Sequence, residues 1–189
     1  MKHKIFGLAV VVFAACQSPQ IRPADLLFHV SEVENAITAV TPAMIDHVAI
    51  AVSRDSVIEA VGKGVVTTPL DSLRAQKGHY LVARVRRADR RKSLENARVY
   101  LGRHYDWLYL PDNDAIYCSE LVQLSFVDGH GRPIFQTVPM TFRDSTGQIP
   151  SHWLELYRQH GIAVPEGLPG SNPAELSQRK IVKIVGKLQ

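Results

Sequence analysis

The chain contains few cysteines, no long apolar run and little excess charge of either sign. Its 189 residues include two cysteines, Cys16 and Cys118, too few for a disulfide framework or a cysteine zinc site. Hydrophobic residues make up 46% and charged residues 21%, which excludes a disordered, collagen-like or polytopic membrane protein. The basic cluster between Arg84 and Lys92 lacks interleaved aromatics and leads into a helical pattern. It is typical of a solvated helix start rather than of a nucleic-acid site.

Residues 1–15 follow the order of a secretory signal. Lys2 and Lys4 form a basic start, Ile5–Phe13 is an apolar run, and two alanines then precede Cys16. The run is too short to cross a bilayer core, which needs roughly 20 apolar residues in a helix. Phe-Ala-Ala-Cys at 13–16 is similar to the lipobox of bacterial lipoproteins. We therefore expect a signal peptide over residues 1–15 and a lipid on Cys16.

Export changes what the charge and the second cysteine imply. Removing Lys2 and Lys4 leaves 20 of the 22 Lys and Arg against 18 Asp and Glu, so the formal charge falls from +4 to +2. An exported protein rarely meets DNA or RNA, and we expect no nucleic-acid partner. If Cys16 is acylated, Cys118 is a lone thiol in an oxidising compartment. Such a thiol indicates a functional group, an intermolecular disulfide, a buried structural cysteine or pairing with Cys16.

The hydrophobic pattern predicts one α+β domain over residues 25–189, preceded by a tether at 16–24. Strands are expected at 26–30, 47–52, 57–61, 79–85 and 181–185. Helices are expected at 31–40 (opened by a capping box of Ser31 and Glu34), 89–101, 118–127 and 151–161. The Pro- and Gly-rich segment from about 163 is expected to be an extended surface tail. Together these elements predict an antiparallel sheet with helices packed against it.

Cys118 stands where an irregular loop enters an apolar helix. A thiol at a helix N-terminus meets the positive end of the helix dipole and free N–H groups, which stabilise its thiolate. The backbone N–H of Cys118 itself is placed to donate to an oxyanion. Cys118 is therefore a candidate nucleophile.

His47 and Glu59 lie on two predicted strands joined by a short turn. His47 shares one strand face with Ala49 and Ala51, which leave room beside it. In any hairpin register where paired positions sum to an even number, Glu59 lies on that same face, directly or diagonally opposite His47. A histidine there takes the thiol proton, and a carboxylate fixes its tautomer. Taken alone, a histidine on a strand more often has a structural role, and a glutamate on an exposed strand face is more often simply solvated.

The same residues carry a resemblance to a known family. The segments concerned are Asp-Leu-Leu-Phe at 25–28, Asp-His-Val-Ala-Ile at 46–50, Val-Ile-Glu-Ala at 57–60, Leu-Gly-Arg-His-Tyr-Asp at 101–106 and Tyr-Cys-Ser-Glu-Leu-Val at 117–122. From about Asp25 to Pro173 the chain resembles the YaeF/YiiX group of permuted papain-like hydrolases, relatives of NlpC-type cell-wall peptidases. In that group the histidine strand precedes the cysteine helix, as it does here.

The resemblance implies a circularly permuted papain-like fold with Cys118 as nucleophile, His47 as general base and then acid, and Glu59 as orienting residue. It also implies that Tyr117 lies beside the nucleophile as an oxyanion or substrate-binding residue. Ala24 and Ala49 stand where the family commonly has glycine, and neither belongs to the proposed triad.

We therefore expect an exported thiol amidase or peptidase of the bacterial cell envelope, anchored through Cys16 and facing the periplasm. Its substrates would be cell-wall or short peptides. No cofactor is expected, and the other histidines show no metal-ligand spacing. Two alternatives remain. One is a lipid or peptide acyltransferase, although the relatives of that kind carry Asn-Cys-Glu-His-Phe at the nucleophile. The other is a non-catalytic lipoprotein that binds a peptide in the same groove.

Overall fold

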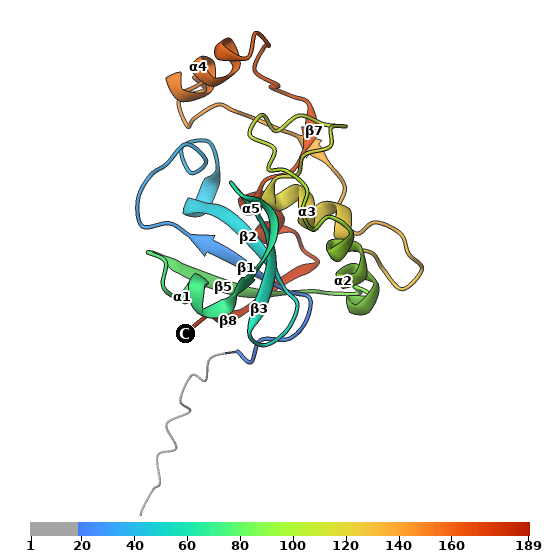
Figure 1. Cartoon of the computed structure of the whole chain (residues 1–189). Coiled ribbons are helices and arrows are strands. Elements are labelled where there is room, and N and C mark those ends of the chain that lie inside the picture. Colours follow the sequence, from blue (N-terminus) through green and yellow to red (C-terminus); the bar gives the residue numbers. More distant parts are fainter. Residues whose placement is uncertain (1–18) are drawn as a thin grey trace, which may run out of the picture.

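The structure is a computed structural model and describes residues 19–189. The expected signal peptide and Cys16 lie outside the described residues. A six-stranded antiparallel sheet with strand order β4-β3-β2-β1-β5-β8 forms the centre of the domain (Figure 1). Its strands are β1 (Asp25–Val30), β2 (Ile45–Ala51), β3 (Ser56–Val61), β4 (Gly64–Pro69), β5 (His79–Val85) and β8 (Val182–Lys187). A small second sheet pairs β6 (Val138–Pro139) with β7 (Pro169–Gly170).

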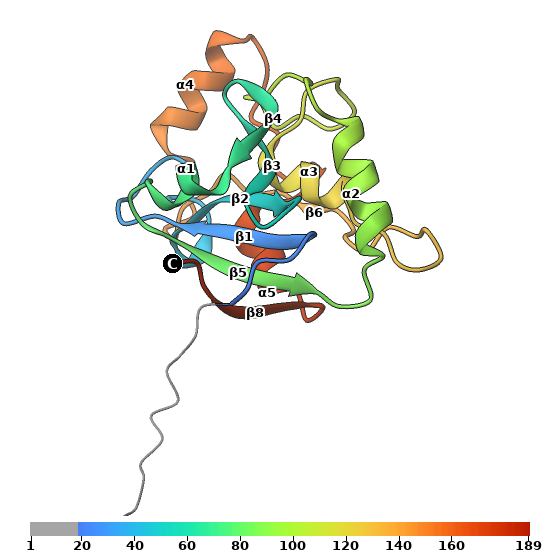
Figure 2. The ribbon, with the colours of Figure 1, turned by 60° about the horizontal axis from the view of Figure 1, so that its bottom comes forward.

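Helices pack on both faces of the large sheet (Figures 1 and 2). One face carries α2 (Arg90–Val99), α3 (Cys118–Ser125) and α5 (Pro173–Gln178), whose apolar residues join one core with β1, β2 and β3. The other face is covered by α1 (Leu70–Arg74). The helix α4 (Ser151–Gln159) stands away from the sheet over an aromatic cluster, and a short 3-10 helix, η1 (Pro42–Met44), precedes β2. Within residues 19–189, no helix has both the length and the apolar character needed to span a membrane.

Most of the predicted elements are confirmed to within a few residues. β1, β2, β3, β5 and β8 match the five predicted strands, and α2, α3 and α4 match three of the four predicted helices. Asp89 begins α2 as a cap, since its side chain accepts from the backbone N–H of Lys92 at 2.9 Å. β4 and α1 were not predicted from the sequence.

The predicted helix over 31–40 is wrong, because this segment forms turns instead. Asn35 accepts hydrogen bonds from the backbone N–H groups of Ile37 and Thr38, both at 3.0 Å, and its own N–H donates to Thr38 Oγ1. Short polar side chains that bond to nearby backbone groups in this way compete with helix formation. The amide group of Asn35 also donates to Asp46 at 2.6 Å. This hydrogen bond holds the segment against β2 as a loop.

The expected surface tail from about 163 is also wrong in part, because it contains a helix that belongs to the core. Asn172 caps α5 by accepting from the N–H of Glu175 at 2.7 Å, and Pro173 occupies the first turn. Ala174 and Leu176 are fully buried against the sheet. A short helix built on a Pro-rich entry has too little periodicity to stand out in the sequence.

The hairpin of β3 and β4 holds the 101–106 segment by backbone contact. The N–H of Val65 donates to the carbonyl of Arg103 at 2.8 Å, and the N–H of Gly102 donates to the carbonyl of Val65 at 2.9 Å. Gly64 has a φ of +100°, and a Cβ placed on it would lie 2.3 Å from the carbonyl oxygen of Arg103. Only glycine allows the two segments to approach this closely.

Candidate active site

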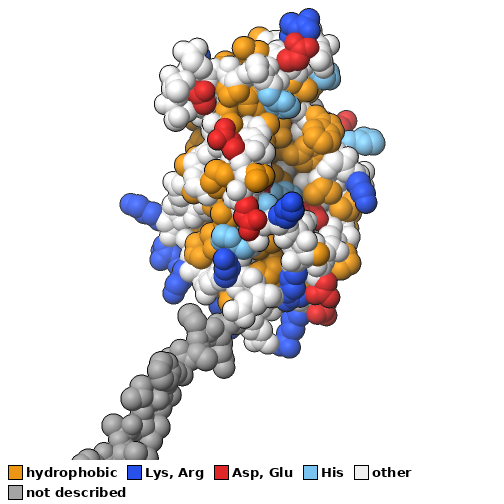
Figure 3. Space-filling view, turned by 90° about the vertical axis from the view of Figure 1, so that its left-hand side faces the viewer, with side chains coloured by type: hydrophobic (Ala, Val, Ile, Leu, Met, Phe, Trp, Pro, Cys, Tyr) orange, Lys and Arg blue, Asp and Glu red, His pale blue; other side chains and the backbone are white. Residues whose placement is uncertain are grey.

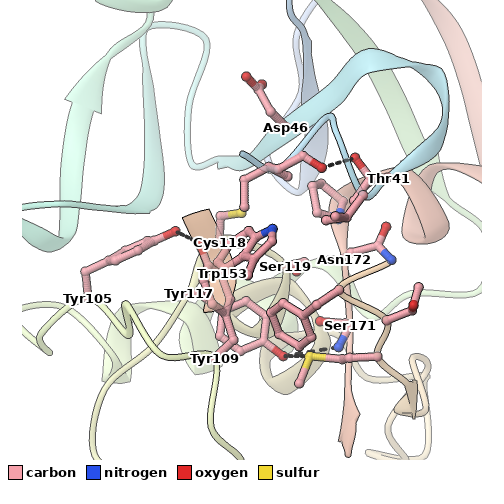
Figure 4. Close-up of a pocket in the computed structure, with 16 residues that line it drawn as sticks. Thr41, Asp46, Tyr105, Tyr109, Tyr117, Cys118, Ser119, Trp153, Ser171 and Asn172 are labelled. Atoms are coloured by element: carbon pink, nitrogen blue, oxygen red, sulfur yellow. Dashed lines mark hydrogen bonds between the residues drawn. The ribbon is translucent and has the colours of Figure 1, made fainter. Parts of the chain in front are cut away.

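Cys118 occupies the first position of α3 and lines a cleft to which Asp46 of β2 and Trp153 of α4 also contribute (Figure 4). Its N–H has no intrahelical acceptor, because the first amides of a helix have no partner within it. The residue is 5% exposed, and within residues 19–189 it is the lone cysteine. The structure thus places a buried thiol against the free amides of a helix start.

His47 lies near the start of β2 and contacts Glu59 of β3. Its Nε2 and the Glu59 Oε2 are 2.7 Å apart. Glu59 is 3% exposed and also hydrogen-bonds to the side chain of Thr68 on β4. With Nε2 occupied by Glu59, the Nδ1 of His47 is the nitrogen left for Cys118. The structure therefore brings together the cysteine, histidine and glutamate that the sequence analysis selected.

The pKa values of this pair follow from burial and from the partners of His47. Burial lowers the pKa of His47, but hydrogen bonds and charge interactions with Cys118 and Glu59 outweigh it and raise that pKa from 6.5 to about 10. Burial likewise works to raise the pKa of Glu59, and the bond to His47 holds it below the ordinary 4.5. His47 is therefore protonated at neutral pH, and its positive charge stabilises negative charge on its neighbours.

A second histidine–carboxylate pair lies next to the first, across a β-bulge. His29 of β1 pairs with His47 while Val30 pairs with Ile45, so Asp46 is the extra residue of the bulge. Asp46 Oδ1 lies 2.6 Å from His29 Nδ1, and His29 Nε2 lies 2.7 Å from the carbonyl oxygen of Lys77. Since both ring nitrogens of His29 face acceptors, both must donate, and the ring is an imidazolium. The hydrogen bond to Asp46 accordingly raises the pKa of His29, while burial opposes it.

Two tyrosines take different positions around Cys118. The Tyr117 hydroxyl accepts from the N–H of Ser171 at 3.1 Å and donates toward Met140 Sδ, which makes this ring part of the cleft wall. Tyr105 points toward Cys118 and Tyr109 (Figure 4), and its hydroxyl lies 3.4 Å from that of Tyr109. Tyr117 was predicted from the sequence to lie beside Cys118, whereas Tyr105, which belongs to the 101–106 segment, was not. No pattern in the sequence distinguishes a tyrosine that faces the cleft from one that packs.

Two cavities flank Cys118. The narrow cavity has a volume of about 50 Å³ and is lined by residues that include Tyr117, Cys118, Ser119, Met140 and Phe142. The wide cavity has a volume of about 570 Å³ and is lined by residues that include His29, His47, Glu59, Trp107 and His152. Residues common to both are Ile37, Asp46, Tyr105, Tyr109 and Trp153. Cys118 thus opens onto the narrow cavity, and His47 onto the wide one.

These features define the class of protein. A cysteine at a helix start, with a histidine on a strand earlier in the chain, is a papain-like arrangement in permuted order. The chain belongs to the family described as permuted papain-like amidase enzymes, YaeF/YiiX, C92 family, whose model matches residues 20–186. The permuted papain-like fold predicted from the sequence is confirmed, and at this coarse level the chain is a cysteine hydrolase of an amidase family.

Two Escherichia coli proteins are similar to it. The uncharacterized protein YiiX of strain K12 is 32% identical over 133 residues, a match that spans 65% of this chain and 65% of that protein. A crystal structure described as metalloprotein YiiX from O157:H7 has a TM-score of 0.74 and 24% identity, and covers 89% of this chain and 98% of that one. The second match shows the shared fold. In residues 19–189 of this chain, no group of three or more His, Cys, Asp or Glu side chains is arranged to hold a metal ion.

Proposed function

We propose that the protein is an amidase that cleaves its substrate through an acyl-enzyme on Cys118. The observation that carries this proposal is the position of His47 between Cys118 and Glu59, with a pKa raised to about 10. A histidine that holds its proton at neutral pH next to a thiol favours the thiolate–imidazolium pair, which is the reactive form of a cysteine nucleophile.

The steps follow from the positions of these groups. The sulfur attacks the amide carbonyl carbon, and the oxyanion is stabilised by the free N–H of Cys118 and the hydroxyl of Tyr105. His47 gives its proton to the leaving nitrogen, the C–N bond breaks, and an acyl thioester remains on Cys118. His47 then takes a proton from water, which attacks the thioester and releases the acid. Glu59 holds the imidazole in orientation throughout.

We further propose that the substrates are cell-wall or short peptides, and that the protein is exported, lipid-anchored through Cys16 and facing the periplasm. The order of basic residues, apolar run, small residues and cysteine at the N-terminus supports export. Fractionation of a bacterial host expressing the wild type and Cys16→Ser tests the anchor. We expect membrane association for the wild type and its loss in the variant, whereas equal distribution of the two would contradict the proposal.

The proposed chemistry is tested first without a substrate. In a full-length Cys16→Ala chain, in which Cys118 is the remaining cysteine, the alkylation rate with iodoacetamide is measured between about pH 5 and pH 9. We expect fast alkylation at low pH that is lost in His47→Ala and reduced in Glu59→Ala. His160→Ala, on an exposed residue after α4, is the control. If Cys118 is alkylated slowly and at the same rate with or without His47, the protein is a binding protein and the proposed enzyme activity is wrong.

A substrate panel then tests the reaction itself. Peptidoglycan fragments and acyl-peptides are incubated with the wild type and Cys118→Ala, with and without an added amine. We expect thiol-dependent release of the acid, with water as the acceptor. Transfer to the added amine in place of hydrolysis would identify an acyltransferase instead.

A further inference from the structure

The two cavities beside Cys118 differ in volume, and each is lined by a different part of the proposed catalytic machinery. Cys118 and Ser119 line the narrow cavity of about 50 Å³, whereas His47 and Glu59 line the wide cavity of about 570 Å³. Tyr105, which lines both, stands at the boundary between them. This division matters because cleavage of an amide separates an acyl part from an amine part, and the bond that breaks lies at that boundary.

The chemistry assigns each half to one side. When Cys118 Sγ bonds to the carbonyl carbon, the acyl part becomes attached to the cysteine. When the C–N bond breaks, the nitrogen takes its proton from His47 and departs on the histidine side. The acyl part therefore lies in the narrow cavity and the amine part in the wide one.

The narrow cavity limits what the acyl part is. One water-sized group needs roughly 10–15 Å³ of such volume, so about 50 Å³ holds about three to five of them. The walls are largely apolar, with Met140, Phe142 and Trp153 among them. No Lys or Arg lines either cavity. On the face that Figure 3 draws, most Lys and Arg side chains lie at the edges and in the lower half of the domain. A long chain and an anionic group both fit this space poorly.

Three residues that line the narrow cavity have a buried polar atom without a partner. Within the part of the chain that the structure describes, Ser119 Oγ, Trp153 Nε1 and Ser171 Oγ make no hydrogen bond. The three residues are 0%, 2% and 4% exposed. Buried polar groups are normally satisfied, and an indole N–H donates only. Ser119 and Ser171 line the narrow cavity alone, whereas Trp153 lines both cavities. A group in the narrow cavity that satisfies the Trp153 N–H must therefore offer an acceptor.

We propose that the acyl half of the substrate is a short, uncharged group carrying a hydrogen-bond acceptor, and that the amine half is the larger part. This inference rests on the proposed function and names the substrate class for the same site. A short hydroxyacyl or alkoxyacyl amide of a peptide-sized amine has this composition, and a long-chain fatty acyl amide does not. The acceptor of the acyl group takes the hydrogen bond of the Trp153 N–H.

Four activated esters test the size and the polarity of the acyl group. The p-nitrophenyl esters of acetic, butyric, octanoic and methoxyacetic acid are applied to the full-length Cys16→Ala chain. Acylation of Cys118 is followed by nitrophenolate release and intact mass, and each rate is divided by that of glutathione. We expect octanoyl to react at least about 10-fold more slowly than butyryl. Methoxyacetyl, which replaces one methylene of butyryl by oxygen, should react about 10-fold faster than butyryl.

Variants then assign the effects to residues. Trp153→Phe keeps a ring but removes the N–H, so the preference for methoxyacetyl over butyryl should disappear. Met140→Ala widens the cavity and should raise the relative rate of octanoyl. Tyr100→Phe, which also removes one polar atom from a ring but lines neither cavity, is the matched control and should keep both preferences.

The outcomes separate this inference from the proposed function. If octanoyl reacts fastest, or if Trp153→Phe keeps the methoxyacetyl preference, the inference is overturned while Cys118 remains the nucleophile. If iodoacetamide alkylates Cys118 rapidly but no ester outpaces glutathione, the acyl site is likewise refuted. If Cys118 is inert to iodoacetamide as well, the proposed function fails and this inference fails with it.

Discussion

His47 and Glu59 meet at 2.7 Å although they are not directly opposite each other in β2 and β3. The register pairs Ile50 with Ile58 and Ala51 with Val57, and its continuation sets Glu59 opposite Ala49. His47 and Glu59 are therefore diagonal neighbours on one face of the hairpin. The small side chain of Ala49 leaves the space through which they reach each other.

Replacing Glu59 by Gln should lower the pKa of His47. The variant keeps an acceptor for the imidazole but removes the charge that favours the imidazolium, so we expect a fall of about 1–2 pH units from the present value. A nitrogen NMR titration of the His47 ring measures it, and alkylation of Cys118 at pH 6 should slow in parallel. Glu155→Gln on the exposed face of α4 is the control. An unchanged His47 titration would show that Glu59 contributes no charge to the pair.

Replacing His29 by Gln should destabilise the fold more in weak acid than in base. The pKa of His29 is raised by Asp46, so its stabilising contribution is complete below the unfolded value of 6.5 and is lost as the pH rises through the folded value. The pKa of Asp46 is lowered despite burial, by His29 and Asn35, so the carboxylate persists well into acid. We expect a loss of about 1–3 kcal/mol in urea unfolding at pH 5.5 and a smaller loss at pH 9.

His130→Gln is the control for this measurement, because His130 is exposed on a loop. A His29→Gln loss that is the same at pH 5.5 and pH 9 would mean that packing, and not the charge on His29, holds the 35–41 loop.

Replacing Glu120 by Gln should stabilise the protein above neutral pH. Burial chiefly raises the pKa of Glu120 to about 7, with Asp106 and Asp112 adding to it and the Tyr117 N–H opposing it. When the pKa of a carboxyl is higher in the folded than in the unfolded protein, the free energy of unfolding falls as the pH rises from about 4.5 to 7. We expect Glu120→Gln to gain about 1–3 kcal/mol at pH 8 and nothing at pH 4, by urea unfolding at both. An equal gain at both values would exclude the buried charge as its cause.

Alanine substitutions at two glycines should differ sharply in cost. Gly64 and Gly102 have φ values of +100° and +86°, so both disfavour a side chain. A Cβ on Gly64 would meet the Arg103 carbonyl at 2.3 Å, whereas one on Gly102 would meet nothing within 4 Å. We expect Gly102→Ala to cost about 1 kcal/mol and Gly64→Ala more than about 2 kcal/mol in thermal or urea unfolding. Equal costs would show that the hairpin shifts freely away from the 101–106 segment.

Local patterns were enough to predict five of the six strands of the large sheet and the elements that carry Cys118, His47 and Glu59. The alternation of apolar residues identifies β2 and β3, and the short turn between them leaves few possible registers. Any register in which paired positions sum to an even number places Glu59 within reach of His47. The helix starting at Cys118 follows from its apolar spacing. In each case the information lies within a few residues of the element concerned.

The parts that could not be predicted depend on contacts distant in sequence. The 31–40 segment has helical spacing, but Asn35 bonds to Asp46 across the bulge and holds it as a loop. The same holds for the cavities, whose walls come from α3, α4 and separate loops. Tyr105 and Trp153 become neighbours of Cys118 only once those elements have packed together.

The start and the end of the described chain lie side by side, which bears on the order of the two catalytic elements. A Cβ added to Gly186 of β8 would lie 2.8 Å from Pro19, and the views in Figures 1 and 2 agree on this proximity. A variant could join β8 to Pro19 by a short linker and have its new ends between β5 and α2. Its elements would keep the same contacts, but α3 would precede β2 along the chain. Such a rearranged gene would encode the unpermuted order of papain, nucleophile before histidine, on an unchanged sheet. This cut would thus keep the arrangement of Cys118, His47 and Glu59, and the permutation concerns the route of the backbone alone.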